Sequence, residues 1–279
     1  MSRRTVPDPQ PADAPSTITA CGKRRPTIAV VTVCLNDVPG LKATFKSLRA
    51  QTQEPHQWIV ADGGSTDGTS DWLHKQDWTR LEWSSEPDGG IFFGMNRGLR
   101  EVDSDYVLFL NSGDELASAD VLVSVSDYLA AADEWPPLLY GDSFEVDAKG
   151  RGYLRRARPS YWVRVGMPST HQAMYFRVDA IAGGLDTRHR LSGDYEAVAR
   201  LYLPKRGEDF GYLAKALCRF KLGGRSETQI TTLLREHTEI RRRVLGMSAV
   251  IAGLLLAAHT LHGLIKRRLP ILHRLVRYG

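Results

Sequence analysis

The 279-residue sequence is poor in cysteine: Cys21, Cys34 and Cys218 are its three thiols, and no two of them form a CxxC pair. An odd number of widely spaced cysteines offers neither a disulfide framework nor a zinc site, and it suits a reducing compartment. Residues 1–25 also lack the apolar run that a secretory signal needs. We therefore expect a cytoplasmic protein in which residues 1–26 form a disordered N-terminal segment.

Acidic residues are absent from Ile240 to Gly279, a segment that contains eight Lys or Arg residues. Subtracting these eight charges from the net charge of +5 leaves −3 for the rest of the chain. Proteins that bind nucleic acid usually interleave basic and aromatic residues across a fold, whereas these basic residues bracket an apolar stretch. The pattern argues against a nucleic-acid partner and favours an anionic membrane surface.

The apolar stretch, Val244 to Ile265, has 22 residues without Asp, Glu, Lys or Arg, which is long enough to cross a bilayer. Its glycines, histidines and hydroxyl residues make it a poor spanning helix, and basic clusters at both ends conflict with the positive-inside tendency. Two alternatives remain for residues 227–279: a helical extension attached peripherally to the cytoplasmic face of the membrane, or a helical pair packed on the main domain.

Short apolar runs followed by polar residues indicate the architecture of that domain. The runs span Thr27–Cys34, Gln57–Ala61 and Tyr106–Leu110, with a helical pattern from Leu41 to Arg49 after a break at Pro39–Gly40. Strand, helix and strand in this order are typical of an α/β fold with a doubly wound, mostly parallel sheet flanked by helices. In such sheets ligands bind beyond the carboxyl ends of the strands.

Weaker patterns follow in the second half of the chain. Leu138–Tyr140 and Met174–Phe176 are predicted as short strands, and Tyr195–Leu203 is predicted as a helix that begins near Ser192. A carboxylate at such a helix start, Asp194, could serve as a general base, or it could simply cap the helix. His171, beside an apolar run, is more often a structural residue than a catalyst.

The loop after the second run reads Asp62-Gly-Gly-Ser-Thr-Asp-Gly-Thr69. Its glycines would let the backbone approach a ligand, and its hydroxyls and carboxylates could hold a base or ribose. The alternative is an ordinary loop in which Asp67 caps the next helix. Capping explains Asp67 but not Asp62 followed by two glycines, so this loop alone leaves both interpretations open.

Two further polar segments could serve a nucleotide. In Asn111-Ser-Gly-Asp114, the carboxylate could bind Mg²⁺ or Mn²⁺, which need few protein oxygens where substrate phosphates supply the rest. The alternative is that Asp114 caps a helix. The segment from Ser85 to Leu99 could line a diphosphate pocket, or it could form a tight turn and an amphipathic helix with Met95 and Leu99 in the core.

The joint order and spacing of these segments resemble the family 2 glycosyltransferases of GT-A fold. The likeness covers residues 27–226, and it is greatest to the group of colanic-acid and exopolysaccharide fucosyltransferases. The matching stretches are Trp58–Thr69, Ser85–Asp88, Met95–Gly98, Leu108–Asp114, His171–Phe176 and Gly223–Ser226.

The resemblance implies a role for each matching residue. Asp194 would be the catalytic base, Asp114 the ligand of Mn²⁺ or Mg²⁺, and His171 and Gln172 would lie on the acceptor side. The implied donor-binding positions are Asn36, Asp62, Ser65, Asp67, Asp88, Asn96, Arg97 and Asn111.

Three residues depart from the family pattern. Phe93, Asn111 and Gly113 stand where relatives carry aspartates. The departure at Phe93 implies no polar donor contact at that position. The other two imply that the metal rests on Asp114, with donor phosphates and water completing its shell.

The implied reaction is an inverting transfer from a nucleotide-sugar donor to a saccharide or lipid-linked acceptor, in exopolysaccharide or glycolipid synthesis. GDP-fucose is the first donor that the likeness suggests. A nucleotidyltransferase and an inactive binding module are the alternatives. The first would need a glycine-rich phosphate loop where this chain has Leu35-Asn-Asp-Val38, and the near-intact motifs argue against the second.

Overall fold

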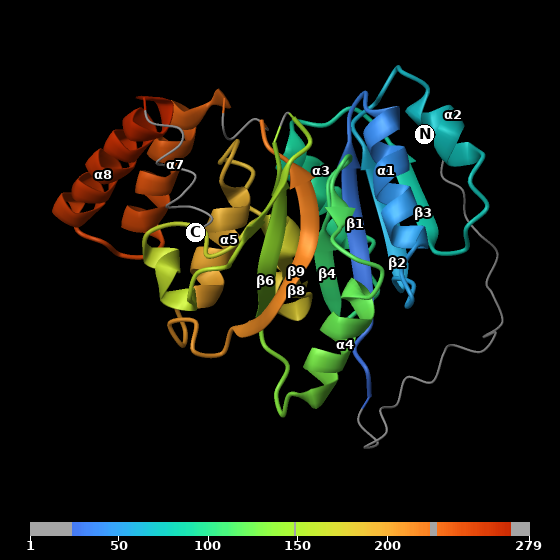
Figure 1. The fold of residues 1–279 in the computed structure, drawn as a ribbon, viewed down its shortest axis with the longest axis horizontal. Helices are drawn as coiled ribbons and strands as arrows, with labels where there is room; N and C mark the ends of the chain where they lie inside the picture. Colours follow the sequence, from blue (N-terminus) through green and yellow to red (C-terminus); the bar gives the residue numbers. More distant parts are fainter. Residues whose placement is uncertain (1–23, 148, 224–227, 269–279) are drawn as a thin grey trace.

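The computed structural model describes residues 24–147, 149–223 and 228–268, which form a mixed sheet flanked by helices (Figure 1). The sheet has nine strands in the order β3-β2-β1-β4-β8-β6-β9-β5, and β7 pairs with β6. The first four of these form a parallel half: β1 (Ile28–Cys34), β2 (Gln57–Asp62), β3 (Leu81–Ser85) and β4 (Tyr106–Phe109). Strands β1, β2 and β4 are almost wholly buried, which explains their continuous apolar sequences.

The other half of the sheet begins where β8 pairs antiparallel with β4. Strand β6 is antiparallel to β8 and β7 and parallel to β9, and β5 is antiparallel to β9. These strands are β5 (Glu115–Leu116), β6 (Leu138–Val146), β7 (Gly152–Arg155), β8 (Met174–Arg177) and β9 (Gly211–Lys221). The predicted α/β architecture is confirmed.

Helices cover both faces of the sheet and form two hydrophobic cores. One core contains residues of α1, α2 and α4, and the other contains residues of α3, α5 and α7. The helices are α1 (Val38–Arg49), α2 (Thr69–His74), α3 (Ile91–Arg100), α4 (Val121–Ala131), α5 (Gly193–Tyr202), α7 (Ile230–Arg243) and α8 (Ala249–Arg268). Short 3₁₀ turns span Ser160–Arg164, His171–Ala173 and Asp179–Ile181.

The break expected at Pro39–Gly40 is instead the beginning of helix α1. Pro39 and Gly40 lie inside its first turn, and Asp37 caps it by accepting a hydrogen bond from Gly40 N at 3.0 Å. Proline is tolerated there because the first N–H groups of a helix have no intrahelical partner. The helix therefore begins at Val38, directly after the polar end of β1.

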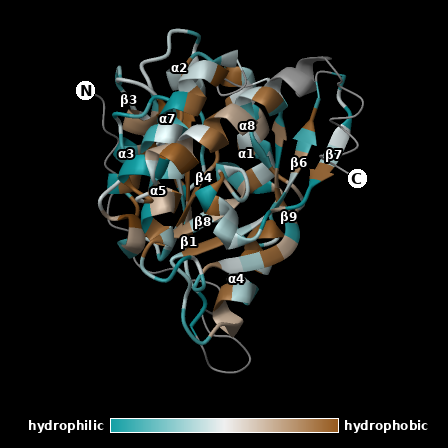
Figure 2. Ribbon diagram, turned by 90° about the vertical axis from the view of Figure 1, so that its left-hand side faces the viewer, coloured by the Kyte–Doolittle hydropathy of each residue, from teal (hydrophilic) through white to brown (hydrophobic). Residues whose placement is uncertain are grey.

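The described C-terminal residues form two helices beside the main domain. Helix α7 packs on α5 and places Ile240 in the second core, and α8 packs on α7 (Figure 1). Figure 2, viewed from their side, shows hydrophilic and hydrophobic residues along both helices. In residues 24–147, 149–223 and 228–268, no helix has the length and hydropathy that crossing a bilayer requires.

Some expected features lie outside the described residues. These are residues 1–23, residues 224–226 of the Gly-Gly-Arg-Ser stretch, and residues 269–279 with two of the basic positions. Arg24, expected in a disordered segment, instead donates two hydrogen bonds to the Asp105 carboxylate at 2.8 and 2.6 Å. Arg24 therefore belongs to the folded domain.

Candidate active site

The loop after β2 is built around the carboxylate of Asp62, which is fully buried. One oxygen accepts from the Ser65 hydroxyl, and the other accepts from Ser65 N at 3.0 Å and from the Ser85 hydroxyl. These bonds fix the loop and join it to the end of β3. Any contribution of Asp62 to ligand binding would therefore pass through the backbone that it shapes.

The loops after β1 and β2 are linked to each other. Asn36 N donates to the Ser65 hydroxyl at 2.7 Å, and Thr66 N donates to Asn36 Oδ1 at 2.8 Å. Asn36 has φ of 52°, a conformation that asparagine tolerates better than most residues. Asp67 accepts from Val38 N at 3.0 Å and from Thr69 N at 3.2 Å, so one side chain serves the first turns of both α1 and α2. The result is a rigid polar edge above β1 and β2.

Asn96 and Arg97 of α3 have protein partners. Arg97 is buried and donates to the backbone oxygens of Asp62 at 2.6 Å and Glu86 at 3.1 Å. Asn96 pairs with both the N–H and the C=O of Leu185, each at 2.8 Å. These contacts occupy the Asn96 amide and both terminal nitrogens of Arg97, while the buried Nε of Arg97 has no hydrogen-bond partner.

Asp88 and Phe93 lie at the N-terminal end of α3. Asp88 accepts from Gly90 N at 2.9 Å, and its other oxygen lies 3.9 Å from Arg97 Nη2. Phe93 is 46% exposed, so this position presents an apolar ring to solvent. Asp88 lies close to the Asp62 loop. A Cβ added at Gly63 would be 3.3 Å from Oδ2 of Asp88.

Five of the expected site residues form a second cluster, apart from the loops around Asn36 and Asp62. His171 Nδ1 lies 3.2 Å from Asp194 Oδ2, and His171 Nε2 lies 3.1 Å from Asn111 Nδ2. Gln172 Nε2 donates to Asp114 Oδ2 at 3.0 Å. The cluster therefore joins the loop after β4, the turn before β8 and the first turn of α5.

Sheet topology explains this meeting of distant residues. Because β8 runs antiparallel to β4, the residues before β8 lie beside the residues after β4. His171 and Gln172 thereby reach Asn111 and Asp114, which are about sixty positions earlier in the chain. Helix α5 then contributes Asp194 from the far side of the histidine.

The environment changes the acidity of two members of the second cluster. Burial raises the pKa of Asp114 to about 6, although the hydrogen bond from Gln172 and the charge of His171 oppose it. Burial lowers the pKa of His171, but the hydrogen bond and charge of Asp194, together with the charge of Asp114, outweigh it and raise that pKa above its ordinary value. Such mutual perturbation is typical of functional sites.

The second cluster contains oxygen atoms of the kind that bind a hard divalent cation, although few of its side chains could coordinate one. The described residues contain no group of three His, Cys, Asp or Glu side chains that could hold a metal. They do contain the Asp114 carboxylate and the buried side-chain oxygen of Asn111, which has no hydrogen-bond partner. Carboxylate and amide oxygens are ligands that Mg²⁺ and Mn²⁺ prefer, with diphosphate and water to complete the shell.

The residues that support the Asp114 loop were not predicted from the sequence. The Thr44 hydroxyl of α1 donates to Asp114 O at 2.8 Å and accepts from Gly113 N at 3.1 Å, and the Ser112 hydroxyl donates to Asp37 Oδ2 at 2.9 Å. Gly113 has φ of 86°, a conformation that glycine adopts without steric cost. Asp37 could have been found as a helix cap before Val-Pro, but nothing in the sequence points to Thr44.

Comparison with known sequences places this geometry in context. The family model described as Glycosyl transferase family 2 matches residues 29–134. An uncharacterized glycosyltransferase of Mycobacterium tuberculosis is 32% identical over 186 residues, which are 64% of this chain and 70% of the relative. A PGL/p-HBAD biosynthesis glycosyltransferase of Mycobacterium bovis is 27% identical over 184 residues, covering 63% of this chain and 70% of the relative.

Solved structures share the fold at low sequence identity. S. aureus TarS 1-349 in complex with UDP-GlcNAc has a TM-score of 0.60 and 16% identity, with 83% of this chain and 71% of that chain covered. The mannosyltransferase PcManGT from Pyrobaculum calidifontis, in complex with GDP-Man and Mn²⁺, also has a TM-score of 0.60 and 16% identity, covering 80% and 65%. The sheet and its flanking helices are thus GT-A-like.

Proposed function

The chain belongs to glycosyl transferase family 2, and from that premise we propose that it moves a sugar from a nucleotide-sugar donor to an acceptor hydroxyl with inversion. The observation that carries this proposal is the contact of Asp194 with His171, beside Asn111 and Asp114, at one edge of the sheet. Family membership gives the reaction class, and this cluster supplies a base next to an oxygen-rich site.

In the proposed step, Asp194 takes the proton of the acceptor hydroxyl as its oxygen attacks the anomeric carbon. The new C–O bond replaces the bond to the nucleoside diphosphate, which leaves with its electron pair. Asp194 Oδ1 accepts from Tyr195 N at 2.8 Å, and Oδ2 faces His171. In the neutral form of His171 that carries its proton on Nδ1, the ring donates to Asp194 and accepts from the Asn111 amide, which satisfies both ring nitrogens.

Asp114 and Asn111 would hold the divalent cation. When bound, Mn²⁺ or Mg²⁺ would offset the negative charge that develops on the departing diphosphate. The cation in the PcManGT complex supports this part of the proposal. The rigid loops around Asn36, Asp62, Ser65 and Asp67 would receive the nucleoside.

Donor identity is open to a direct test. UDP-GlcNAc and GDP-Man are bound in the two neighbouring structures, and we propose GDP-fucose as a third candidate. Thermal unfolding of the full-length protein with each donor, with and without Mn²⁺, should show stabilisation by one donor that requires the metal. An inactive nucleotide-sugar-binding module would show the same stabilisation without consuming the donor.

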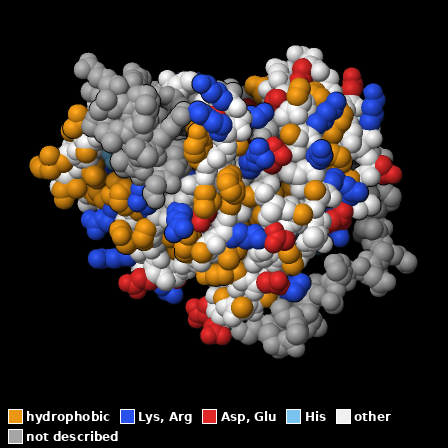
Figure 3. Space-filling view, viewed as in Figure 1, with side chains coloured by type: hydrophobic (Ala, Val, Ile, Leu, Met, Phe, Trp, Pro, Cys, Tyr) orange, Lys and Arg blue, Asp and Glu red, His pale blue; other side chains and the backbone are white. Residues whose placement is uncertain are grey.

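We also propose that α8 attaches the enzyme to an anionic membrane, where a lipid-linked acceptor of exopolysaccharide or glycolipid synthesis would be found. Val250, Leu254 and Leu261 are 72%, 67% and 60% exposed and lie on one side of the helix. Figure 3 shows hydrophobic side chains gathered at the left edge, where α8 lies in Figure 1, with Lys or Arg side chains below them. Arg242 and Arg243 are exposed at the end of α7.

The double substitution Val250→Glu and Leu254→Glu tests this surface. Each apolar side chain gains about 1.5–3 kcal/mol on leaving water, so partition onto phosphatidylserine vesicles should fall about tenfold or more. Leu154→Glu, at an exposed apolar position of β7, is the matched control and should bind like wild type. Co-sedimentation at low salt measures both. Equal binding by wild type and the double variant, or none by wild type, would contradict the proposal.

A further inference from the structure

The loop of residues 184–192 leads directly into Asp194 and is fixed by other elements. At its start, Asn96 of α3 pairs with both backbone groups of Leu185 at 2.8 Å. The guanidinium of Arg200 in α5 donates to Gly184 O at 2.6 Å. Gly184 has φ of 73°, and a Cβ there would lie 2.9 Å from the Asn96 amide, so the approach leaves no room for a larger residue.

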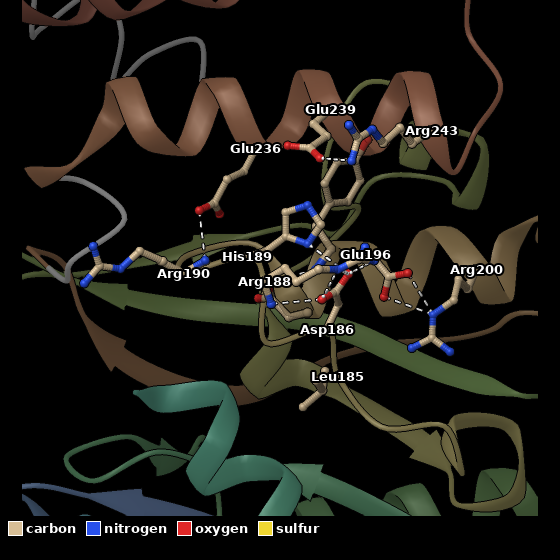
Figure 4. Close-up of polar contacts among 12 residues, drawn as sticks. Leu185, Asp186, Arg188, His189, Arg190, Glu196, Arg200, Glu236, Glu239 and Arg243 are labelled. Carbon is tan, nitrogen blue, oxygen red and sulfur yellow. Dashed lines mark hydrogen bonds and ion pairs between the residues drawn. The ribbon is translucent and has the colours of Figure 1, made fainter. Parts of the chain in front are cut away.

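At the other end of the loop the support comes from the C-terminal helix α7. Glu236 accepts from Arg190 N at 2.9 Å through Oε1 (Figure 4). Its Oε2 accepts from Leu191 N at 3.0 Å. Its side chain is buried, at 4% exposure. Hydrogen bonds from N–H groups to a carboxylate are among the stronger ones in proteins, and a buried carboxylate needs such partners to offset its lost hydration.

Other contacts show that α7 lies against the first turn of α5. The ring of His237 lies 4.5 Å from that of Tyr195, the neighbour of Asp194. Burial and the charge of Arg241 lower the pKa of His237 to about 3, so this histidine stays neutral at physiological pH. Ile240 is fully buried in the core below.

Two of the ion pairs in Figure 4 lie on the surface. Glu239 and Arg243 pair at 2.7 Å on α7, but their side chains are 41% and 74% exposed. The pair of Arg188 with Asp186 is also on the surface, because the arginine side chain is 82% exposed. Exposed pairs contribute little to stability, whereas Glu236 is a buried carboxylate that accepts hydrogen bonds from two backbone N–H groups.

We propose that Glu236 is a positioning residue for sugar transfer. By holding the backbone of Arg190 and Leu191, it sets where α5 begins, and thereby where Asp194 meets His171. This inference rests on the proposed role of Asp194 as the base. It also makes α7 a part of the catalytic unit, in line with one of the two alternatives for residues 227–279, a helical pair packed on the main domain.

Glu236→Gln in the full-length protein tests the proposal. Glutamine keeps the shape but turns an NH₂ group toward one of the two N–H donors. We expect kcat to fall about 10–100-fold, since small displacements of catalytic groups have effects of this size, while the donor KM changes less than about twofold. Amide exchange in residues 186–196 should become faster. Glu239→Gln, one turn further along the same helix, should change neither quantity.

Glu236→Asp keeps both acceptor oxygens on a shorter arm, and it should recover part of the lost kcat; it also replaces the glutamine variant if that protein does not fold. Unchanged amide exchange in Glu236→Gln would overturn the proposal, as would faster exchange with wild-type kcat. The two proposals can fail independently. If the proposed function is wrong, wild type consumes no donor, but amide exchange still shows whether Glu236 holds the loop.

Discussion

Replacing Asp194 by asparagine is expected to lower turnover by about two to four orders of magnitude, the usual contribution of a general base. Asparagine keeps the size of the side chain and can still face His171, but it cannot accept the acceptor proton. Donor affinity should barely change, because the donor loops around Asn36 and Asp62 are held by other contacts. Steady-state kinetics with the donor that stabilises the protein measures both quantities.

Two controls sharpen the Asp194 experiment. Asp179→Asn changes a carboxylate whose side chain is 71% exposed, and it should leave turnover unaltered. His171→Gln should reduce turnover less than Asp194→Asn, because a glutamine amide can still donate to the carboxylate. Wild-type turnover in Asp194→Asn, or a larger loss in His171→Gln, would assign the base to another residue.

The second large effect is expected from Asp114→Asn, which removes the charged ligand of the proposed cation. Stabilisation of the protein by donor and Mn²⁺ together should disappear. Glu115→Gln, the adjacent position, is the matched control and should retain it. Metal-dependent donor binding that survives in Asp114→Asn would refute the assignment.

The same variant carries a stability signature in the absence of metal. Burial raises the pKa of Asp114 to about 6 from its ordinary value of 3.8, so the folded state binds this proton more tightly than the unfolded chain. Stability therefore falls as pH rises from about 4 to 6, and above pH 6 the folded protein retains a buried charge. Asp114→Asn should unfold at a higher temperature than wild type at pH 7, and the difference should shrink toward pH 4.

Three strands of the parallel half could be predicted from sequence, because β1, β2 and β4 are buried on both faces and form continuous apolar runs, whereas the half-exposed β3 was not predicted. Strand β9 escaped prediction because buried and exposed residues alternate irregularly along it. A bulge in its pairing with β6 near Gly141 and Asp142 adds to this irregularity. Strand β5 has only two residues and leaves no periodic signal at all.

The candidate site shows the same division. Polar residues at the ends of β1, β2 and β4 could be found, because a parallel sheet brings strand ends to one edge. The partners of Asn96 and Glu236 could not, because Leu185 and the Arg190–Leu191 backbone lie 89, 46 and 45 positions away. Backbone acceptors and donors have no residue type, so no sequence pattern marks them. The basic residues after Ile240 also favoured a C-terminal extension in the sequence-based prediction, so packing of α7 on the main domain was only one of two alternatives.

Inverting sugar transfer with Asp194 as the base is tested most directly by following donor consumption by NMR. The full-length protein would be used in Mn²⁺, with water as the slow acceptor. UDP-GlcNAc, GDP-mannose and GDP-fucose would be compared for wild type and Asp194→Asn. Wild type is expected to release the nucleoside diphosphate from one donor together with a sugar of inverted anomeric configuration, and Asp194→Asn is expected to do so at least about a hundredfold more slowly. Retention of configuration, or equal rates in the two proteins, would contradict this mechanism.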